Sequence, residues 1–551
     1  MRELIVKHVV RNAAKYGKAN EKAVIGKIIA ENPELRGKAK ELLEEIRKTI
    51  EWFESLSEEE KEELFKKYAE KREEKVEERR LPPLENVKDK VVMRFAPNPN
   101  GPPTLGSARG IVINHEYAKM YKGKFILRFD DTDPRTKRPM IEAYDWYLED
   151  CEWLGAKPDE VIYASKRIPI YYEYAEKLIE MGKAYVCFCE REEFKKYKDA
   201  GEECPHRNSA VEDNLEFWRK MLEGEYREGE AVLRIKTDMK HKDPAVRDWV
   251  AFRIIYEDHP LVGDAYFVYP TLDFESAIED HLLGVTHILR GKDLADSEKR
   301  QRYIYKYFGW EYPVVKLWGR VSIHEFGKLS TSSIKKAIEE GRFTGWDDPR
   351  LPTLKALRRR GFEPEAIRNF FLSLGVGEND VSVSMKNLYA ENRKIVDKKA
   401  NRYFFVWDPV EVEIRGLEER EVEVPLHPNK KEKRVLRGER RVYLTRDDFE
   451  RFKGKEVRLK DFCNILLRED FKAEFISFEL KEAKKGKNII HWLPKSQALK
   501  CRVLGVERDY EGFVESNVIG EVDKVVQFER FAFCRIEKAS EEEVLAIYTH
   551  P

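Results

Sequence analysis

The residues with the clearest chemical potential lie in the stretch RFAPNPNGPPTLGSARG, which runs from Arg94 to Gly110. Four prolines and Gly101 interrupt an apolar strand pattern there, and Gly106 or Ser107 then begins a helix pattern. A strand that turns sharply into a helix presents free backbone N–H groups to an anion such as a phosphate. Many α/β proteins contain such a corner, so taken alone it indicates nucleotide binding only weakly.

Three further blocks lie downstream, and their combination is more specific than any one of them. They read LRFDDTDP at residues 127–134, GVTHILRG at 284–291 and GKLSTS at 327–332. The last follows a strand-like segment and precedes a Lys-rich helix pattern. With the first stretch, these blocks resemble the signatures of class I aminoacyl-tRNA synthetases of the glutamyl and glutaminyl branch, and most closely its archaeal-type glutamyl members.

The resemblance implies a reaction in two steps, in which ATP activates an amino acid and a ribose hydroxyl of tRNA then accepts it. Mg²⁺ is expected with the ATP. The expected partners are glutamate and tRNA(Glu), with tRNA(Gln) as an open alternative. Most of the catalysis would come from positioning and from stabilising phosphate charge, because the blocks contain glycines, hydroxyls and lysines and no nucleophilic triad.

Both signature blocks depart from the family sequences. Thr104 and Ser107 stand where the family has the histidines of HIGH, and Thr331 stands where it has the second lysine of KMSKS. The hydroxyls can still donate hydrogen bonds to phosphate oxygens. The missing positive charge would be supplied in part by Lys328, Lys335 or Lys336. Because of these changes, a tRNA-binding paralogue with impaired catalysis stays an alternative.

The resemblance also assigns roles to individual residues of these blocks. Catalysis is assigned to Thr104, Gly106, Ser107, Lys328, Ser330 and Ser332, and ATP binding to Ala96, Pro97, Asn98, Thr104, Gly106, Ser107, Lys328, Leu329 and Ser330.

Two arginines are predicted to recognise the side-chain carboxylate of the substrate, Arg94 and Arg290. A guanidinium group forms paired, charge-assisted hydrogen bonds with a carboxylate, whereas an amide would present its own N–H donors to the same group. The resemblance supports this prediction, since glutaminyl members have a neutral residue at the position of Arg290. The alternative is that Arg290 is a strand-end arginine paired with Asp293 or Asp296.

Asp130 and Tyr269 complete the predicted glutamate site. Asp130 follows the strand pattern KFILRF, and the family uses the matching carboxylate to hold the ammonium group of the amino acid. The alternative for Asp130 is a turn cap. Leu272 stands where family members usually have a pocket tyrosine, so the contact is absent or passes to Tyr269, for which a core position is the competing interpretation.

A cysteine and histidine cluster is predicted within the middle of the chain. Cys187, Cys189, Cys204 and His206 form a CxC and CxH pattern. Three thiols and an imidazole can complete a tetrahedral, structural zinc site, and some glutamyl-tRNA synthetases have zinc ligands with such a spacing. Unliganded reduced thiols are the alternative.

Composition restricts the protein class but says little about partners. The chain has 551 residues, 42% of them hydrophobic, and 103 basic against 103 acidic residues. A global basic field is therefore absent, so RNA contacts must come from local patches. Seven cysteines and the lack of an apolar run of roughly 20 residues favour a cytoplasmic protein with reduced thiols. We expect a monomer or a weak dimer.

The predicted fold class is multidomain, with an α/β Rossmann-like class I synthetase core, an N-terminal helical domain and a C-terminal all-β barrel region that binds the anticodon. The expected domains are an appended helical domain (1–86), the first half of the catalytic domain (87–184), an inserted acceptor-binding subdomain (185–275), the second half of the catalytic domain (276–332), a helical junction (333–400) and the β-barrel region (401–551). Within the junction, Arg358, Arg359 and Arg360 are predicted to contact tRNA phosphates, with a solvated helix face as the alternative.

Overall fold

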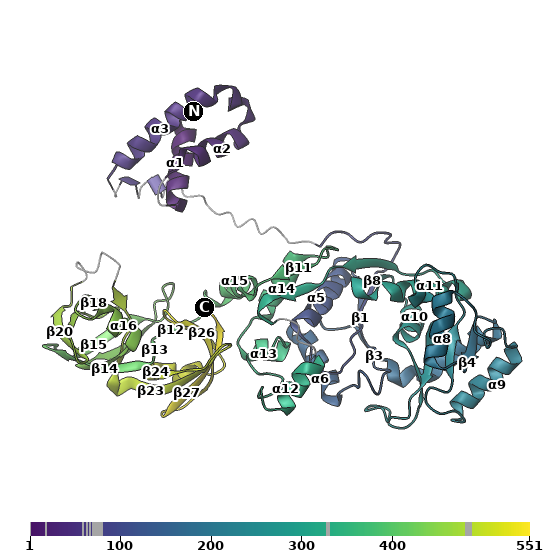
Figure 1. Cartoon of the computed structure of the whole chain (residues 1–551). Helices are drawn as coiled ribbons and strands as arrows, with labels where there is room; N and C mark the ends of the chain where they lie inside the picture. The colour runs from purple at the N-terminus through teal and green to yellow at the C-terminus, as the bar shows by residue number, and fades with distance from the viewer. Residues whose placement is uncertain are drawn as a thin grey trace. The chain divides into compact units, whose positions relative to one another are not determined.

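The computed structural model describes residues 2–16, 19–57, 60–61, 64–65, 68, 81–326, 331–479 and 488–551 (Figure 1). The chain divides into two compact units, Met1–Arg80 and Leu81–Pro551. Lys328, Leu329 and Ser330, which the sequence predicts to act on ATP, lie outside the described residues. Among the described helices, none combines the length and apolar composition that crossing a bilayer requires.

The first unit is helical where it is described, as the sequence predicts. Its elements are α1 (Arg2–Tyr16), α2 (Glu21–Glu31), the 3₁₀ helix η1 (Pro33–Lys38) and α3 (Ala39–Ser55). Asn20 caps α2 by accepting a hydrogen bond from the Ala23 N–H. The apolar faces of the helices meet in one small core, formed by Ile5, Val9, Val10, Val24, Ile28, Leu42, Ile46 and Phe53.

The second unit begins with a parallel sheet whose strands alternate with helices. Its elements are β1 (Val92–Phe95), α5 (Leu105–Met120), β2 (Lys124–Phe129), α6 (Ile141–Trp153) and β3 (Glu160–Tyr163). The strand order is β1-β2-β3, and both pairs are parallel. Helix α5 is buried almost all round, and a Cβ at Gly110 would collide with the Phe95 ring, so glycine lets the helix lie close to β1.

A second parallel pair continues this layer from far along the chain. It consists of β8 (His287–Gly291) and β9 (Val314–Trp318). Thr286, directly before β8, donates its N–H to the Val92 carbonyl and accepts the Val92 N–H on its hydroxyl. Side chains of all five strands share one apolar cluster, formed by Val92, Ile126, Ile162, Ile288 and Val315 with Val285. The α/β core is thus assembled from two separate segments, as the sequence predicts.

The segment between these two halves forms its own antiparallel sheet. The order is β4-β5-β6-β7, and each strand pairs with the next. Its elements are η2 (Ala164–Arg167), α7 (Ile168–Glu180), β4 (Ala184–Cys187), α8 (Arg191–Ala200), α9 (Val211–Leu222), β5 (Val232–Ile235), η3 (Pro244–Val246), β6 (Val250–Ile254), β7 (Val268–Pro270) and α10 (Leu272–Leu282). The 3₁₀ helix η4 (Lys292–Leu294) and helix α11 (Ala295–Phe308) belong to the second half of the core, where they connect β8 to β9. The predicted boundary at residue 275 falls inside α10, so this helix joins the insert to the core.

Short helices connect the core to the C-terminal region. They and two short strands are β10 (Val321–Ile323), η5 (His324–Phe326), α12 (Thr331–Glu339), α13 (Leu354–Arg359), α14 (Pro364–Leu374), β11 (Val381–Val383) and α15 (Met385–Val396). Helix α13 is bonded at its start to the first signature block, because Leu354 donates its N–H to the Pro103 carbonyl and Leu105 donates to the Pro352 carbonyl.

Two curled seven-stranded sheets form the C-terminal region (Figure 1). One has the order β12-β25-β26-β27-β23-β24-β13 and the other β21-β18-β19-β20-β14-β17-β22, with β15-β16 as a separate hairpin. The bounds are β12 (Arg402–Tyr403), β13 (Phe405–Trp407), β14 (Pro409–Arg415), β15 (Arg420–Pro425), β16 (Lys433–Gly438), β17 (Arg441–Thr445), α16 (Arg446–Phe452), β18 (Glu456–Leu459), β19 (Asn464–Leu467), β20 (Lys472–Ser477), β21 (Ile489–Ile490), β22 (Leu493–Pro494), η7 (Lys495–Gln497), β23 (Ala498–Leu504), β24 (Tyr510–Glu515), η8 (Ser516–Glu521), β25 (Val525–Phe528), β26 (Ala532–Ala539) and β27 (Glu543–His550). The prediction of a β region is confirmed, with α16 as an added helix that Thr445 caps.

Candidate active site

A cavity of about 200 Å³ lies where three strands of the parallel layer end. Arg94 is near the end of β1, Asp130 follows β2, and Arg290 is near the end of β8. Open α/β sheets bind their ligands at the carboxyl ends of the strands. The lining residues are Arg94, Phe95, Ala96, Asn114, Asp130, Leu272, Ser276, Leu289, Arg290, Gly291, Leu294, Ser297, Gln301 and Trp318. Three of the four residues predicted to bind glutamate therefore share one cavity.

Arg290 is buried at this cavity, and no carboxylate of the described residues pairs with it. Its side chain is only 5% exposed, and its partners are the neutral groups of Gln301, 2.8 Å away, and Tyr312, 3.5 Å away. The alternative pairing is wrong, because Asp293 lies 3.8 Å from Arg320 and Asp296 pairs with Lys299. Since a buried charge is unfavourable unless it is paired, this guanidinium favours an anionic ligand.

Arg94 differs, because an acidic residue already compensates it. Its Nε and Nη2 atoms donate to the two carboxylate oxygens of Asp280 at 3.0 and 3.2 Å. Arg128 donates to the same carboxylate at 2.7 Å. Burial alone would raise the pKa of Asp280, but the two guanidinium groups lower it to about 2. Arg94 lines the cavity, and its predicted contact with the substrate stays a prediction.

Asp130 is held by Arg128 and does not cap a turn. Arg128, which is fully buried, donates from Nε and Nη2 to the two oxygens of Asp130 at 2.6 and 3.2 Å. The turn is capped instead by Asp133, whose Oδ1 accepts the N–H groups of Arg135 and Thr136. The turn-cap alternative for Asp130 is therefore wrong, while its predicted contact with an ammonium group stays a prediction.

Tyr269 lies outside the cavity, contrary to the prediction that it contacts glutamate. The ring is fully buried in the core beneath the inserted sheet, and the hydroxyl donates to the Tyr266 carbonyl at 2.8 Å. Leu272, at the family's tyrosine position, does line the cavity and is 40% exposed. The wall that a tyrosine would form is thus apolar in this protein.

The first signature block forms a capped helix start. Thr104 is the N-cap of α5; its hydroxyl accepts the Ser107 N–H, and the Ser107 hydroxyl accepts the Thr104 N–H in return. A Cβ at Gly101 would collide with the methyl group of Thr331, so the start of α12 lies directly against this turn. The two blocks that the sequence separates by more than 200 residues therefore meet.

The loop before this helix is attached to the end of β2. Asp130 donates its N–H to the Pro97 carbonyl, and the Asn98 amide donates to the Asp130 carbonyl, each at 3.0 Å. Ala96 lines the cavity, Gly106 is exposed in the first turn of α5, and Ser332 lies in the first turn of α12. The predicted ATP-binding residues that the structure describes thus lie at the turn next to the cavity.

Sequence reasoning missed the residues that support this cavity. Arg128 stands within an apolar strand, Asp280 and Ser276 lie on α10, and Gln301 lies on α11. Burial, with the nearby Asp130 carboxylate, raises the pKa of Glu275 well above its usual range. The sequence signal that could have identified this support is Arg128, a charged residue inside the apolar pattern KFILRF. The other supporting residues become neighbours of the cavity only through the fold.

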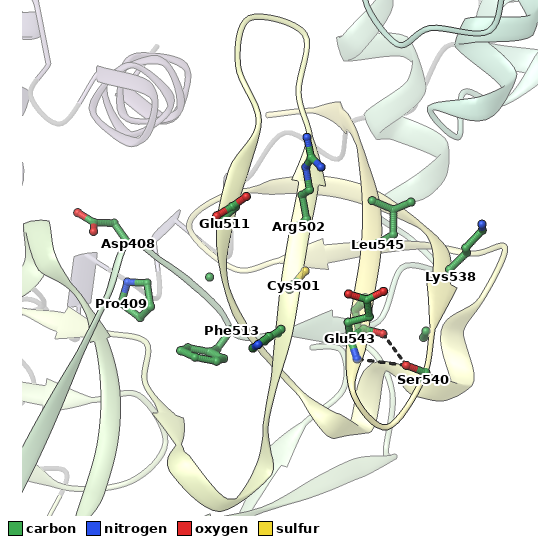
Figure 2. Close-up of a pocket in the computed structure, with 14 residues that line it drawn as sticks. Asp408, Pro409, Cys501, Arg502, Glu511, Phe513, Lys538, Ser540, Glu543 and Leu545 are labelled. Carbon is green, nitrogen blue, oxygen red and sulfur yellow. Dashed lines mark hydrogen bonds between the residues drawn. The ribbon is translucent and has the colours of Figure 1, made fainter. Parts of the chain in front are cut away.

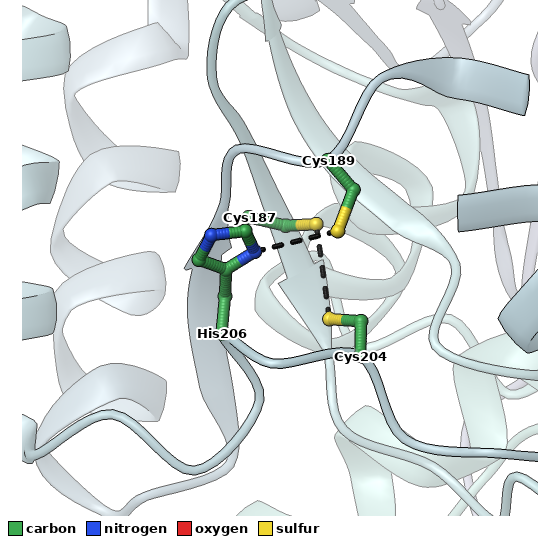
Figure 3. Close-up of side chains that lie close together, drawn as sticks. All are labelled: Cys187, Cys189, Cys204 and His206. Atoms are coloured by element: carbon green, nitrogen blue, oxygen red, sulfur yellow. Dashed lines mark hydrogen bonds between the residues drawn. The ribbon is translucent and has the colours of Figure 1, made fainter. Parts of the chain in front are cut away.

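The predicted metal ligands come together in the inserted segment (Figure 3). The donor atoms of Cys187, Cys189, Cys204 and His206 all lie within 4.8 Å of one another. The Cys187 and Cys204 sulfurs are 4.0 Å apart, and Cys189 Sγ is 3.4 Å from His206 Nδ1. Zn–S bonds of about 2.3 Å in a tetrahedron place the ligand atoms roughly 3.8 Å apart, so this arrangement fits zinc.

The three junction arginines form contacts within the protein. Arg360 is fully buried and donates to the carbonyls of Tyr548 and Thr549, so the prediction that it contacts tRNA phosphates is wrong. Arg359 forms a two-bond pair with Glu537, and Arg358 pairs with the buried Asp150. The phosphate contact stays a prediction for the latter two arginines. These three arginines instead connect α13 and the residue after it to the α/β core, through Asp150, and to the C-terminal sheet, through Glu537, Tyr548 and Thr549.

The C-terminal region has a larger cavity of about 910 Å³ that the sequence did not predict (Figure 2). Its charged lining residues are balanced, with Lys500, Arg502 and Lys538 against Asp408, Glu511 and Glu543. The half-buried Phe513 also lines it, and its ring stacks on Tyr443 with ring centres 4.5 Å apart.

Comparison with known proteins gives matches over the whole chain. Family models described as tRNA synthetases class I (E and Q), catalytic domain and anti-codon binding domain, match residues 90–398 and 400–481. A glutamate–tRNA ligase of Archaeoglobus fulgidus is 73% identical over the full length of both chains, and one of Methanothrix thermoacetophila is 54% identical over 100% of this chain and 99% of its own. A crystal structure of a glutamate tRNA ligase from Elizabethkingia meningosepticum in complex with its amino acid covers 57% of this chain and 71% of its own, at 23% identity and a TM-score of 0.42. The family models and the two full-length relatives show that the chain belongs to the class I tRNA synthetases of the E and Q type.

Proposed function

We propose that this chain is a glutamate–tRNA ligase. In the first step, an oxygen of the glutamate α-carboxylate attacks the α-phosphate of ATP, and pyrophosphate leaves. In the second step, a ribose hydroxyl of the terminal adenosine of tRNA attacks the carbonyl of the glutamyl-adenylate, and AMP leaves. Two relatives that match along their whole length bear the name of this activity. The single structural observation that carries the proposal is the buried, unpaired charge of Arg290.

Arg290 favours an acid over its amide. Because the Arg290 guanidinium is buried, a glutamate side chain that reaches it would neutralise it and accept two hydrogen bonds from it. A glutamine side chain would leave the charge buried and turn an N–H group toward another donor, which a desolvated site penalises heavily. This is why a glutamate enzyme is favoured over a glutaminyl enzyme, the alternative within the same family.

The other residues of the cavity have complementary roles in this proposal. Asp130 would hold the ammonium group, and Arg94 would join Arg290 in recognising the side-chain carboxylate. The turn at Thr104 to Ser107 would place backbone N–H groups and hydroxyls next to the phosphates, where negative charge develops. Mg²⁺, when bound with ATP, would neutralise part of the phosphate charge.

Two further binding functions complete the proposal. The Cys187, Cys189, Cys204 and His206 cluster would hold one structural zinc ion, since four protein ligands leave no open position for chemistry. Metal analysis of the purified protein tests this and should find one zinc per chain. The β region after residue 400, whose first part matches the anti-codon binding domain model, would contact splayed bases of tRNA. The cytoplasm is the expected location.

The decisive experiment is tRNA-dependent exchange of pyrophosphate into ATP. Exchange that requires glutamate, and that glutamine does not support, is the expected result. Exchange that requires glutamine instead would identify the glutaminyl alternative, and no exchange with either amino acid would identify an impaired tRNA-binding paralogue. Aminoacylation of purified tRNA(Glu) and tRNA(Gln) transcripts would then establish which acceptors are used.

A further inference from the structure

The neutral side chains beside Arg290 form a closed triangle. Gln301 Oε1 accepts hydrogen bonds from Arg290 Nη2 at 2.8 Å and from the Tyr312 hydroxyl at 2.6 Å. Arg290 Nη1 lies 3.5 Å from the same hydroxyl. Gln301 is 1% exposed and also lines the cavity. One amide oxygen therefore holds the guanidinium group at the position where it meets the ligand.

The orientation of this amide follows from its neighbours. A guanidinium group can only donate hydrogen bonds, so the oxygen of Gln301, and not its nitrogen, must face Arg290. Burial raises the pKa of Tyr312 to about 12, which keeps the phenolic proton on Tyr312 for donation to the same oxygen. Two donors thus fix the amide oxygen, and the oxygen fixes the plane of the guanidinium group.

The support behind the triangle is rigid. Gln301 and Ser297 lie one turn apart on α11, and both line the cavity. The ring of Tyr305, from the same helix, packs edge-on against the Tyr312 ring at 4.7 Å, and the Arg302 guanidinium lies 4.5 Å from the centre of that ring. Side chains held by packing of this kind place a charged group accurately.

The side chain at position 301 determines whether the Arg290 guanidinium is already paired with a carboxylate or stays available to an anionic ligand. A glutamate there would have the same length and would hold the guanidinium equally well, but it would also neutralise it. The chain has 103 acidic residues and only three glutamines, so glutamine is an uncommon residue in this protein. An amide is the side chain that orients the guanidinium without competing with an anionic substrate.

We propose that Gln301 is a positioning residue for acidic-substrate selectivity, which acts by orienting Arg290 while leaving its positive charge uncompensated. This inference rests on the proposed function and extends it from Arg290 to the residue behind it. It predicts that selectivity responds to the charge at position 301, even though no atom of that residue need contact the reacting groups.

Two variants and a control test the proposal in full-length enzyme with tRNA present. Gln301→Glu should raise KM for glutamate about a hundredfold or more, because an internal carboxylate replaces the substrate's as the partner of Arg290. Gln301→Met, which removes the acceptor without adding charge, should raise it about tenfold. For both variants KM for ATP should stay within about twofold and the melting temperature should hold. Lys306→Gln, an exposed site on the same helix, changes the net charge as Gln301→Glu does and should have no effect.

The outcomes separate this inference from the proposed function. If the wild-type enzyme shows no glutamate-dependent exchange, the proposed function fails. If the wild type is active but Gln301→Glu keeps its KM for glutamate within about twofold, the role of Gln301 is overturned. The role is equally overturned if both variants raise KM for ATP and glutamate together and lower the melting temperature, since that pattern describes a purely structural residue.

Discussion

The two sides of the cavity at the strand ends differ in how their buried charges are compensated. On one side, Arg94 and Arg128 face Asp130 and Asp280, so two positive charges meet two negative charges. On the other side, the partners of Arg290 among the described residues are the amide of Gln301 and the hydroxyl of Tyr312, both neutral. The charges of the first side are balanced within the protein, whereas the proposal assigns the balancing charge of the second side to an anionic ligand.

The largest effect is expected from the removal of Arg128, which pairs with both Asp130 and Asp280. Arg128→Met should lower the free energy of unfolding of the catalytic unit by about 3–5 kcal/mol, because it leaves buried carboxylates without their partner. Urea unfolding followed by tryptophan fluorescence measures this. A loss below about 1 kcal/mol would show that the two sides do not differ as described.

The open side should respond in function and not in stability. Arg290→Gln should reduce kcat/KM for glutamate by about 3 kcal/mol, or roughly 150-fold, because the substrate carboxylate loses the buried guanidinium group that no carboxylate among the described residues compensates. The melting temperature should be unchanged or higher, since an unpaired buried charge is removed. Steady-state exchange kinetics and thermal melting of the same preparation check both halves. Unchanged glutamate kinetics would refute the assigned role of Arg290.

Acid should affect the balanced side through Asp280. Its pKa in the folded protein is about 2, below the ordinary value of 3.8, so ionised Asp280 stabilises the fold above about pH 4. As the pH falls toward 2, protonation removes this contribution, which is of the order of 2 kcal/mol. Asp280→Asn should therefore show a weaker loss of stability between pH 5 and pH 2.5 than the wild type in urea unfolding.

The smallest effect is expected at Asp133, which lies on neither side of the cavity. Asp133→Ala removes a turn cap and a partly exposed pair with Arg253, so it should cost about 1 kcal/mol of stability. Glutamate and ATP kinetics should not change. A large loss of activity in this variant would show that the cavity depends on the turn as well as on the ion pairs.

The α/β core and the place of Arg290 at a strand end beside the cavity could be predicted from the sequence, because each depends on local pattern. Strand and helix periods are legible along the chain, and the end of a strand marks the ligand edge of a parallel sheet. Burial of single residues could not be predicted in the same way. Tyr269 and Arg360 become core residues through elements far away in the chain, and Asp280 meets Arg128 across 152 positions of sequence.

Helix α13 is short, but hydrogen bonds at its two ends connect it to different regions of the second unit. Its first residue, Leu354, is bonded to the turn before α5, and the residue after its end, Arg360, is bonded to two carbonyls of β27, the last strand of the chain. At 1.5 Å per residue, its six residues span about 9 Å. One short helix thus connects the terminal strand to the turn before α5, and displacement of one relative to the other would strain the helix or break its end contacts.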